Sequence, residues 1–163
     1  MKKQLAIFIT CWLSTTAANV AHAELSVGLG MGSLFGGLGL NLAAKTDHNL
    51  VYVAAGCYAI VFSTEGDKND TCGPAAGWLT ESGWNKKAFL GIYGGNVGAY
   101  SDRHHKGLFT EERYHADYGA GVSLQYFFKG LAESSFVLGP SLGAGFSDDK
   151  THFYLSFTVG YQF

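Results

Sequence analysis

The chain has 163 residues, with 13 acidic and 11 basic side chains, a formal net charge of −2 and 47% hydrophobic residues. This length fits one domain, and the slight acidic excess argues against nucleic acid as a partner. The chain also contains 23 glycines. Because a glycine inside a helix costs about 1 kcal/mol relative to alanine, this content argues against a helical bundle and favours closely paired strands.

The first 23 residues have the pattern of a secretory signal peptide. Lys2 and Lys3 precede an apolar run over residues 5–13, and Ala21-His22-Ala23 is a typical cleavage site. The apolar run is much shorter than the roughly 20 residues of a membrane-spanning helix. We therefore predict a signal peptide over 1–23 and a mature domain over 24–163, with a net charge of −4 because the signal carries two lysines and no acid.

Eight segments of the mature chain alternate between apolar residues and small or polar ones. This period of two is typical of strands that have one apolar face. In the fifth segment the alternation slips at Gly94-Gly95, and we predict a β-bulge there that places Val97 and Ala99 on the same outer face as residues 90 and 92. The predicted strands cover residues 25–31, 38–44, 50–62, 72–84, 88–100, 118–128, 136–146 and 152–163.

The last predicted strand carries the most specific signal. Its apolar residues hold one parity to the end of the chain, where Tyr161 precedes a final Phe163. This ending resembles the terminal strand signal of bacterial outer-membrane β-barrels. The whole of residues 24–163 resembles the small eight-stranded barrels of the OmpX, opacity and OmpA-transmembrane-domain type. The resemblance implies an all-β fold, an eight-stranded antiparallel up-and-down transmembrane β-barrel, located in the bacterial outer membrane.

Aromatic residues recur at a spacing that suits a membrane. In three strands, two aromatic residues of the outer parity lie ten positions apart, about 33 Å along a strand. At a tilt of about 40°, this gives roughly 25 Å of height, which matches the apolar band between the two aromatic girdles of such barrels. The pairs are Tyr118 and Phe128, Phe136 and Phe146, and Phe153 and Phe163.

The connections follow the asymmetry of the same class. Short turns are predicted around 46–49, 85–87 and 129–135, and we expect them on the periplasmic side. Longer or more charged connections are expected on the extracellular side, around 33–37, 63–71, 101–117 and 147–151.

The inward parity is mostly Gly, Ser, Ala and Thr, with Asn41, Gln125 and Gln162 as its larger polar members. Either bulky residues such as Tyr154 and Phe127 fill the interior, or a narrow cavity remains. Pro140 removes a ladder donor from the middle of a strand, so we expect a bulge or another irregularity beside it.

Two cysteines remain in the mature chain, Cys57 and Cys72. In an exported protein a disulfide is the default expectation, and one hairpin register places the two residues directly opposite each other. Arg103, Lys106 and Arg113 are candidates for contacts with lipopolysaccharide phosphates. Tyr161 and Phe163 are expected to form the signal read by the barrel-assembly machinery. We expect a monomer surrounded by outer-membrane lipid and lipopolysaccharide.

The leading functional hypothesis is an integral outer-membrane protein with a structural or surface-interaction (adhesion-like) role. A lipid-A-modifying enzyme of the acyltransferase or deacylase type is the first alternative. No His-x-Ser pair occurs, and the nearest strings are His115-Ala116-Asp117 and His152-Phe153-Tyr154. A narrow conduit for small molecules is the second alternative. The spacing of His104, His105 and His115 fits no standard zinc site, so we expect neither a metal nor another cofactor.

Overall fold

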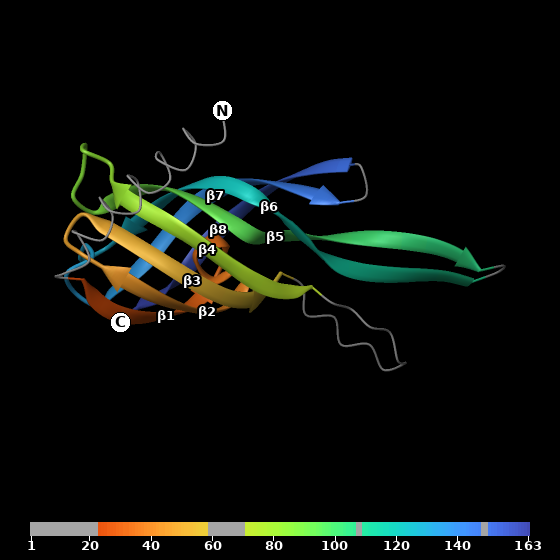
Figure 1. Ribbon diagram of the computed structural model, residues 1–163, viewed down its shortest axis with the longest axis horizontal. Helices are drawn as coiled ribbons and strands as arrows, with labels where there is room; N and C mark the ends of the chain where they lie inside the picture. Colours follow the sequence, from red (N-terminus) through yellow and green to blue (C-terminus); the bar gives the residue numbers. More distant parts are fainter. Residues whose placement is uncertain (1–22, 59–70, 107–108, 148–149) are drawn as a thin grey trace, which may run out of the picture.

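The computed structural model describes residues 23–58, 71–106, 109–147 and 150–163. Eight antiparallel strands follow one another in chain order and close into a barrel, which confirms the predicted all-β, up-and-down architecture (Figure 1). No helix in these residues is long and apolar enough to cross a membrane. The elements are β1 (Glu24–Met31), the 3₁₀ turn η2 (Ser33–Phe35), β2 (Leu38–Lys45), β3 (Asn49–Cys57), β4 (Cys72–Glu81), β5 (Ala88–Lys106), β6 (Phe109–Phe127), β7 (Ser135–Ser147) and β8 (Lys150–Gln162).

The two ends of the barrel differ in shape. One end, which we call the turn end, carries Glu24, Phe163 and the three short connections β2–β3, β4–β5 and β6–β7. The opposite, loop end carries the other four connections. There the β5–β6 and β7–β8 hairpins continue well past the β1–β2 hairpin (Figure 1).

The prediction of a long charged connection over 101–117 is wrong. Backbone pairing continues from Ala88↔Tyr126 to Lys106↔Phe109, so most of this stretch is a β-hairpin that projects from the barrel. A hairpin that extends beyond the wall has no buried face to enforce alternation, yet it still pairs its backbone groups. The side chains of residues 102–106 and 109–113 are not among those that the structure describes.

The irregularity in β5 lies beyond the predicted Gly94-Gly95 position. The register with β6 shifts between Asn96 and Gly98, and Gly95 adopts a positive φ of 116°. Val97 is consequently fully buried, so its predicted outer position is wrong. The prediction of a strand over 72–84 is too long, because β4 ends at Glu81. β3 ends at Cys57, and residues 59–62 of its predicted range lie outside the described residues.

The expected irregularity beside Pro140 is confirmed as an interruption of the ladder. β6 pairs with β7 at Ser123↔Ser141 and again at Tyr126↔Leu138, with no pairing between them and no change of register. The β7–β8 ladder is continuous through Pro140↔Phe157. The missing proline donor therefore faces β6.

The barrel interior is filled by side chains. Phe89 and Phe127 meet edge to face with ring centroids 5.4 Å apart, and both rings are fully buried. The predicted inward amides are buried as well: Asn41 donates to Gln162 Oε1 at 3.1 Å, and Gln125 donates to Thr158 at 3.2 Å. Of the two possibilities left open by the sequence, the filled interior is therefore the one observed among the described residues.

A turn between β1 and β2 also folds into the interior. Residues 32–37, which we call the inner turn, lie at the loop end with the other connections predicted on that side, but they are buried and not exposed. Gly32 and Gly37 exchange backbone hydrogen bonds of 3.0 Å, and the positive φ angles of Gly36 and Gly37 allow the tight reversal. The ring of Phe35 packs against Gly30 and Gly160. It occupies the space that a side chain at either position would need.

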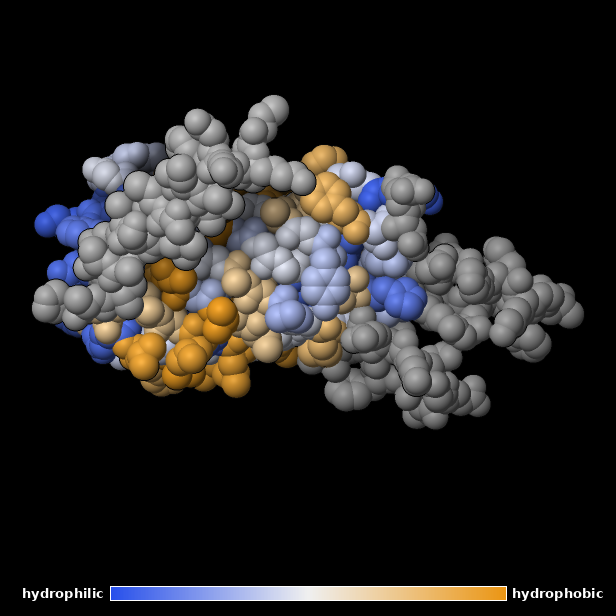
Figure 2. Space-filling view, in the orientation of Figure 1, coloured by the Kyte–Doolittle hydropathy of each residue, from blue (hydrophilic) through white to orange (hydrophobic). Residues whose placement is uncertain are grey.

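The outer wall is apolar. The six aromatic residues at the predicted girdle positions are all exposed, together with large aliphatic side chains of seven strands and Trp78 of β4. Figure 2 shows this apolar surface along the wall, next to a hydrophilic turn end. An apolar outer wall around a partly polar interior is the reverse of the usual arrangement in a soluble domain.

Candidate functional site at the loop end of the barrel

A cluster of polar and aromatic side chains lies inside the loop end of the barrel. β6 contributes Asp117 and His115, β8 contributes His152 and Tyr154, and β5 contributes Tyr100. The positions belong to the inward parity of their strands. Asp117 fits between the strands because Gly145 on β7 has no side chain, and the carboxylate occupies the place of the missing Cβ.

Asp117 is the centre of the cluster. Its side chain is fully buried, and its Oδ2 accepts hydrogen bonds from His152 Nδ1 at 2.9 Å and from the Tyr154 hydroxyl at 2.7 Å. The other oxygen, Oδ1, has no hydrogen-bond partner among the described residues. A buried carboxylate is stable only when charged or donor groups compensate its lost hydration, which is the structural role of the two donors.

Ring stacking holds His152 in place. The Tyr100 ring lies 5.5 Å from the His152 ring at an interplanar angle of 29°, and 5.6 Å from the ring of His115 at 35°. Because an ionised carboxylate only accepts hydrogen bonds, Nδ1 of His152 carries the proton, and Nε2 remains as the second functional atom of the ring. His152 is 34% exposed, so its Nε2 can form a hydrogen bond with a ligand at the loop end.

The His–Asp pair resembles the base of a catalytic triad in one respect only. A buried aspartate orients a partly exposed histidine, which is how such a base is prepared. Hydrolysis would also require a nucleophile, either a side chain or an activated water. No serine, threonine or cysteine hydroxyl or thiol is hydrogen-bonded to His152 among the described residues.

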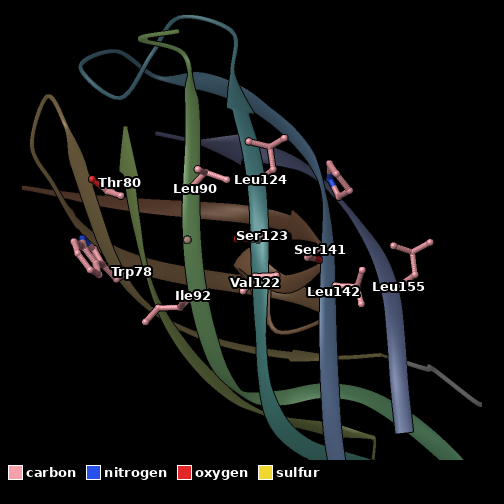
Figure 3. A pocket seen from close by; sticks show the side chains of 12 residues that line it. Trp78, Thr80, Leu90, Ile92, Val122, Ser123, Leu124, Ser141, Leu142 and Leu155 are labelled. Carbon is pink, nitrogen blue, oxygen red and sulfur yellow. The ribbon is translucent and has the colours of Figure 1, made fainter. Parts of the chain in front are cut away.

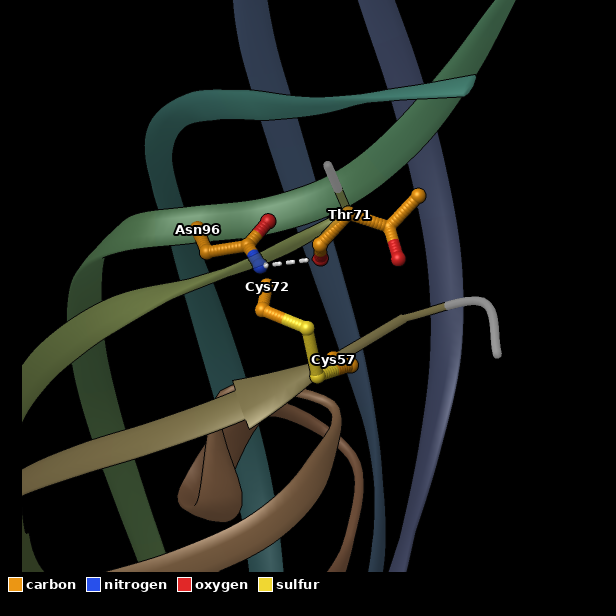
Figure 4. The surroundings of a disulfide bond; sticks show 4 residues. All are labelled: Cys57, Thr71, Cys72 and Asn96. Atoms are coloured by element: carbon orange, nitrogen blue, oxygen red, sulfur yellow. Dashed lines mark hydrogen bonds between the residues drawn. A yellow bond between two sulfur atoms is a disulfide. The ribbon is translucent and has the colours of Figure 1, made fainter. Parts of the chain in front are cut away.

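The predicted cysteine pair is joined at the loop end of β3 and β4. Cys57 and Cys72 lie directly opposite each other in the register and form a disulfide, with Cα atoms 3.9 Å apart (Figure 4). Next to it, the Asn96 amide donates to the backbone oxygen of Thr71 at 3.0 Å, which ties the start of β4 to β5 (Figure 4). These two contacts hold the end of β3 and the start of β4 against each other and against β5.

The predicted lipopolysaccharide contacts occupy the projecting hairpin. Arg103 pairs with Glu112 in the backbone register, Lys106 with Phe109, and Arg113 with Asp102. Their side chains are outside the description, so their role stays a prediction. His104 and His105 lie on the same hairpin. Among the described residues there is no group of three or more His, Cys, Asp or Glu side chains that could hold a metal ion.

The residues of the predicted assembly signal lie at the turn end. The rings of Tyr161 and Phe163 are 4.8 Å apart, and Tyr161 also meets Phe136 at 4.9 Å. Phe163 donates its backbone N–H to Val27 on β1 at 2.9 Å. The structure thus assigns these two aromatic residues to barrel closure, and their recognition by an assembly machinery stays a prediction.

A shallow apolar groove of about 490 Å³ crosses the outer wall from β4 to β8 (Figure 3). It lies on the surface that carries the apolar belt and is lined on its rim by Trp78, Ile92 and Leu155, and it contains no titratable side chain.

The cluster combines two sequence segments that each lack a His-x-Ser pair, His115-Ala116-Asp117 and His152-Phe153-Tyr154. The structure brings Asp117 of the first segment to His152 and Tyr154 of the second, a contact that the sequence does not predict. The signal available in the sequence is that Asp117, His152 and Tyr154 share the inward parity of their strands. The strand registers that bring the two segments together cannot be derived from the sequence.

Comparison of the chain with models of protein families, with curated proteins and with solved structures finds no match.

Proposed function

We propose that this chain is an integral outer-membrane β-barrel of the small eight-stranded type, with a structural or surface-interaction role and its loop end facing outward. The observation that carries the proposal is the apolar outer wall between two sets of exposed aromatic residues, combined with a filled, partly polar interior. A continuous belt of this kind would drive a soluble protein to aggregate, whereas in a bilayer it is satisfied by lipid.

The β5–β6 hairpin supports the surface-interaction part of the proposal. It extends beyond the β1–β2 and β7–β8 hairpins, and its sequence over 101–117 carries seven charged residues. A projecting, charged hairpin on a rigid barrel is a typical arrangement for contacts with other molecules. Partners of the proposed protein are lipopolysaccharide and outer-membrane lipid, and we propose that it acts as a monomer.

Fractionation tests the membrane location. Expressed with its leader, the protein should remain in urea-washed outer membranes, and its folded form should migrate differently from its boiled form. Val122→Arg on the wall should lower the free energy of unfolding in lipid by about 2–4 kcal/mol, because a charge then faces hydrocarbon. Asp47→Arg in the β2–β3 turn is the matched control and should have little effect. A protein that is soluble and folded without detergent would refute the proposal.

An enzyme acting on lipid A is a second candidate, which the pairing of His152 with buried Asp117 favours. The lipid A mass spectrum of cells with wild-type protein should then differ from that of cells with Asp117→Asn or His152→Ala. Identical spectra would end this candidate. A conduit is not proposed, because fully buried Phe35, Phe89 and Phe127 occupy the interior.

A further inference from the structure

The barrel is closed by a short seam between its first and last strands. β1 pairs with β8 only from Gly28↔Gln162 to Met31↔Val159. On its other side, β8 pairs with β7 along its whole length, from Ser135↔Gln162 to Ser147↔Lys150. Residues 150–156 of β8 therefore have no partner strand on the β1 side within the described chain, whereas Phe157 and Thr158 lie against Gly32 of the inner turn. Figure 1 shows the β7–β8 hairpin continuing past the end of β1.

The backbone groups that face this open part of the seam can be identified. Phe163 donates its N–H to Val27 on β1, and N–H groups of a strand point to alternate sides. Because the β7–β8 register has no shift, the odd-numbered residues of β8 all face β1. Thr151, Phe153 and Leu155 therefore direct their N–H and C=O groups into the open seam.

The open part lies at the level of the membrane boundary. The eight residues of β1 span about 26 Å along the strand, or about 20 Å when tilted by 40°, which is less than the roughly 25 Å of the apolar band. Phe153, at the loop-end girdle position, and Leu155 are 77% and 79% exposed. Backbone donors at this depth have neither a strand nor bulk water as a reliable partner, and lipid-exposed edges are strongly disfavoured.

The surrounding side chains define what could satisfy these donors. The outer face of the segment is apolar, through Phe153 and Leu155, and its inner face carries His152 and Tyr154 of the cluster. Asp117 also keeps one buried oxygen without a partner. The fitting ligand thus has carbonyl oxygens for the N–H groups, an acyl chain for the outer face and hydroxyl groups for the inner one. Hydroxylated acyl esters and amides on a sugar combine these features, whereas diacyl phosphatidylethanolamine lacks the hydroxyl groups.

We propose that the open part of the β1–β8 seam binds the lipid A portion of lipopolysaccharide. Acyl carbonyl oxygens accept from the N–H groups of Thr151, Phe153 and Leu155, and the acyl chain lies on the two apolar side chains. His152 and Tyr154, which are partly exposed, meet the hydroxylated part. This site rests on the proposed membrane location, but it is separate from the hairpin that carries Arg103, Lys106 and Arg113.

Amide hydrogen exchange measured by NMR tests the proposal on the wild-type protein. In alkyl maltoside micelles, the amides of Thr151, Phe153 and Leu155 should exchange at least about tenfold faster than those of Tyr154 and Ser156, which face β7. Added lipopolysaccharide should slow the three seam amides about tenfold, and added phosphatidylethanolamine should not. The variant Phe153→Ala/Leu155→Ala should lose this protection, whereas Val122→Ala/Leu142→Ala, on another part of the wall, should retain it.

Three results would overturn the site. Slow exchange of the seam amides before lipid is added would mean that the chain itself closes the seam. Fast exchange after lipopolysaccharide is added would mean that no lipid binds there, and equal protection by both lipids would remove the assignment to lipid A. If the proposed membrane location is wrong, the protein will be soluble and folded without detergent. This outcome is therefore distinguished from a failure of the lipid A site alone.

Discussion

The inner turn offers the sharpest test of how the barrel is held together. Phe35 is fully buried, and its ring fills a space that Gly30 and Gly160 leave open on neighbouring strands. Phe35→Ala removes the ring and leaves a void. Neither glycine has a side chain that could move into this void, so the site cannot collapse easily, and the loss should lie within the range typical of a buried phenylalanine, about 3–5 kcal/mol.

This loss converts into a measurable shift of the urea midpoint. With a slope of about 2 kcal/mol per molar urea, a loss of about 4 kcal/mol moves the midpoint by roughly 2 M. The assay is equilibrium unfolding in lipid vesicles, followed by tryptophan fluorescence. Phe146→Ala is the matched control, because Phe146 is the same residue type but is exposed on the outer wall.

The expected result is a shift for Phe35→Ala at least twice that of the control. Equal shifts for the two variants would mean that the interior contact of Phe35 contributes no more to stability than the outer-wall position of Phe146. A shift below about 0.5 M for Phe35→Ala would refute a stabilising role of the inner turn in the closed barrel.

Three further outcomes follow from the geometry. Replacing Cys57 by serine removes a cross-link between residues 15 apart and should cost about 3 kcal/mol, which reduction of the wild type should reproduce in the same unfolding assay. Gly145→Ala places a Cβ where the Asp117 carboxylate lies, and should both lower stability by about 1–3 kcal/mol and change the NMR signals of the paired histidine ring. Pro140→Ala supplies a donor that faces Leu124 on β6 and should raise stability by about 0.5–1.5 kcal/mol; a decrease would show that the ladder gap has another cause.

The alternating strands could be predicted because burial on one face leaves a period of two in the sequence. This explains why the wall segments, the outward girdle aromatics and the inward amides Asn41, Gln125 and Gln162 were placed correctly. The opposed cysteines followed from one of the hairpin registers that the sequence allows between β3 and β4.

Features without a period were not predictable in this way. The inner turn is buried through contacts with five separate strands, and its short run of Ser33, Leu34 and Phe35 between glycines also suits an outer loop. The hairpin beyond Tyr100 lacks alternation because both of its faces lie beyond the wall. The Asp117–His152 contact depends on two successive strand registers, and a shift of one residue would separate the pair.

The short ladder between β1 and β8 has a consequence for the order of folding. It joins residues more than 125 positions apart, whereas every other ladder joins sequence neighbours through a hairpin. Closing such a long loop has the largest entropic cost, so a sheet of eight strands should form first and its two margins should meet last. A sheet that has not yet closed exposes the full edges of its first and last strands. If the chain enters a membrane, the lifetime of this open sheet would determine how much it depends on a catalyst of insertion.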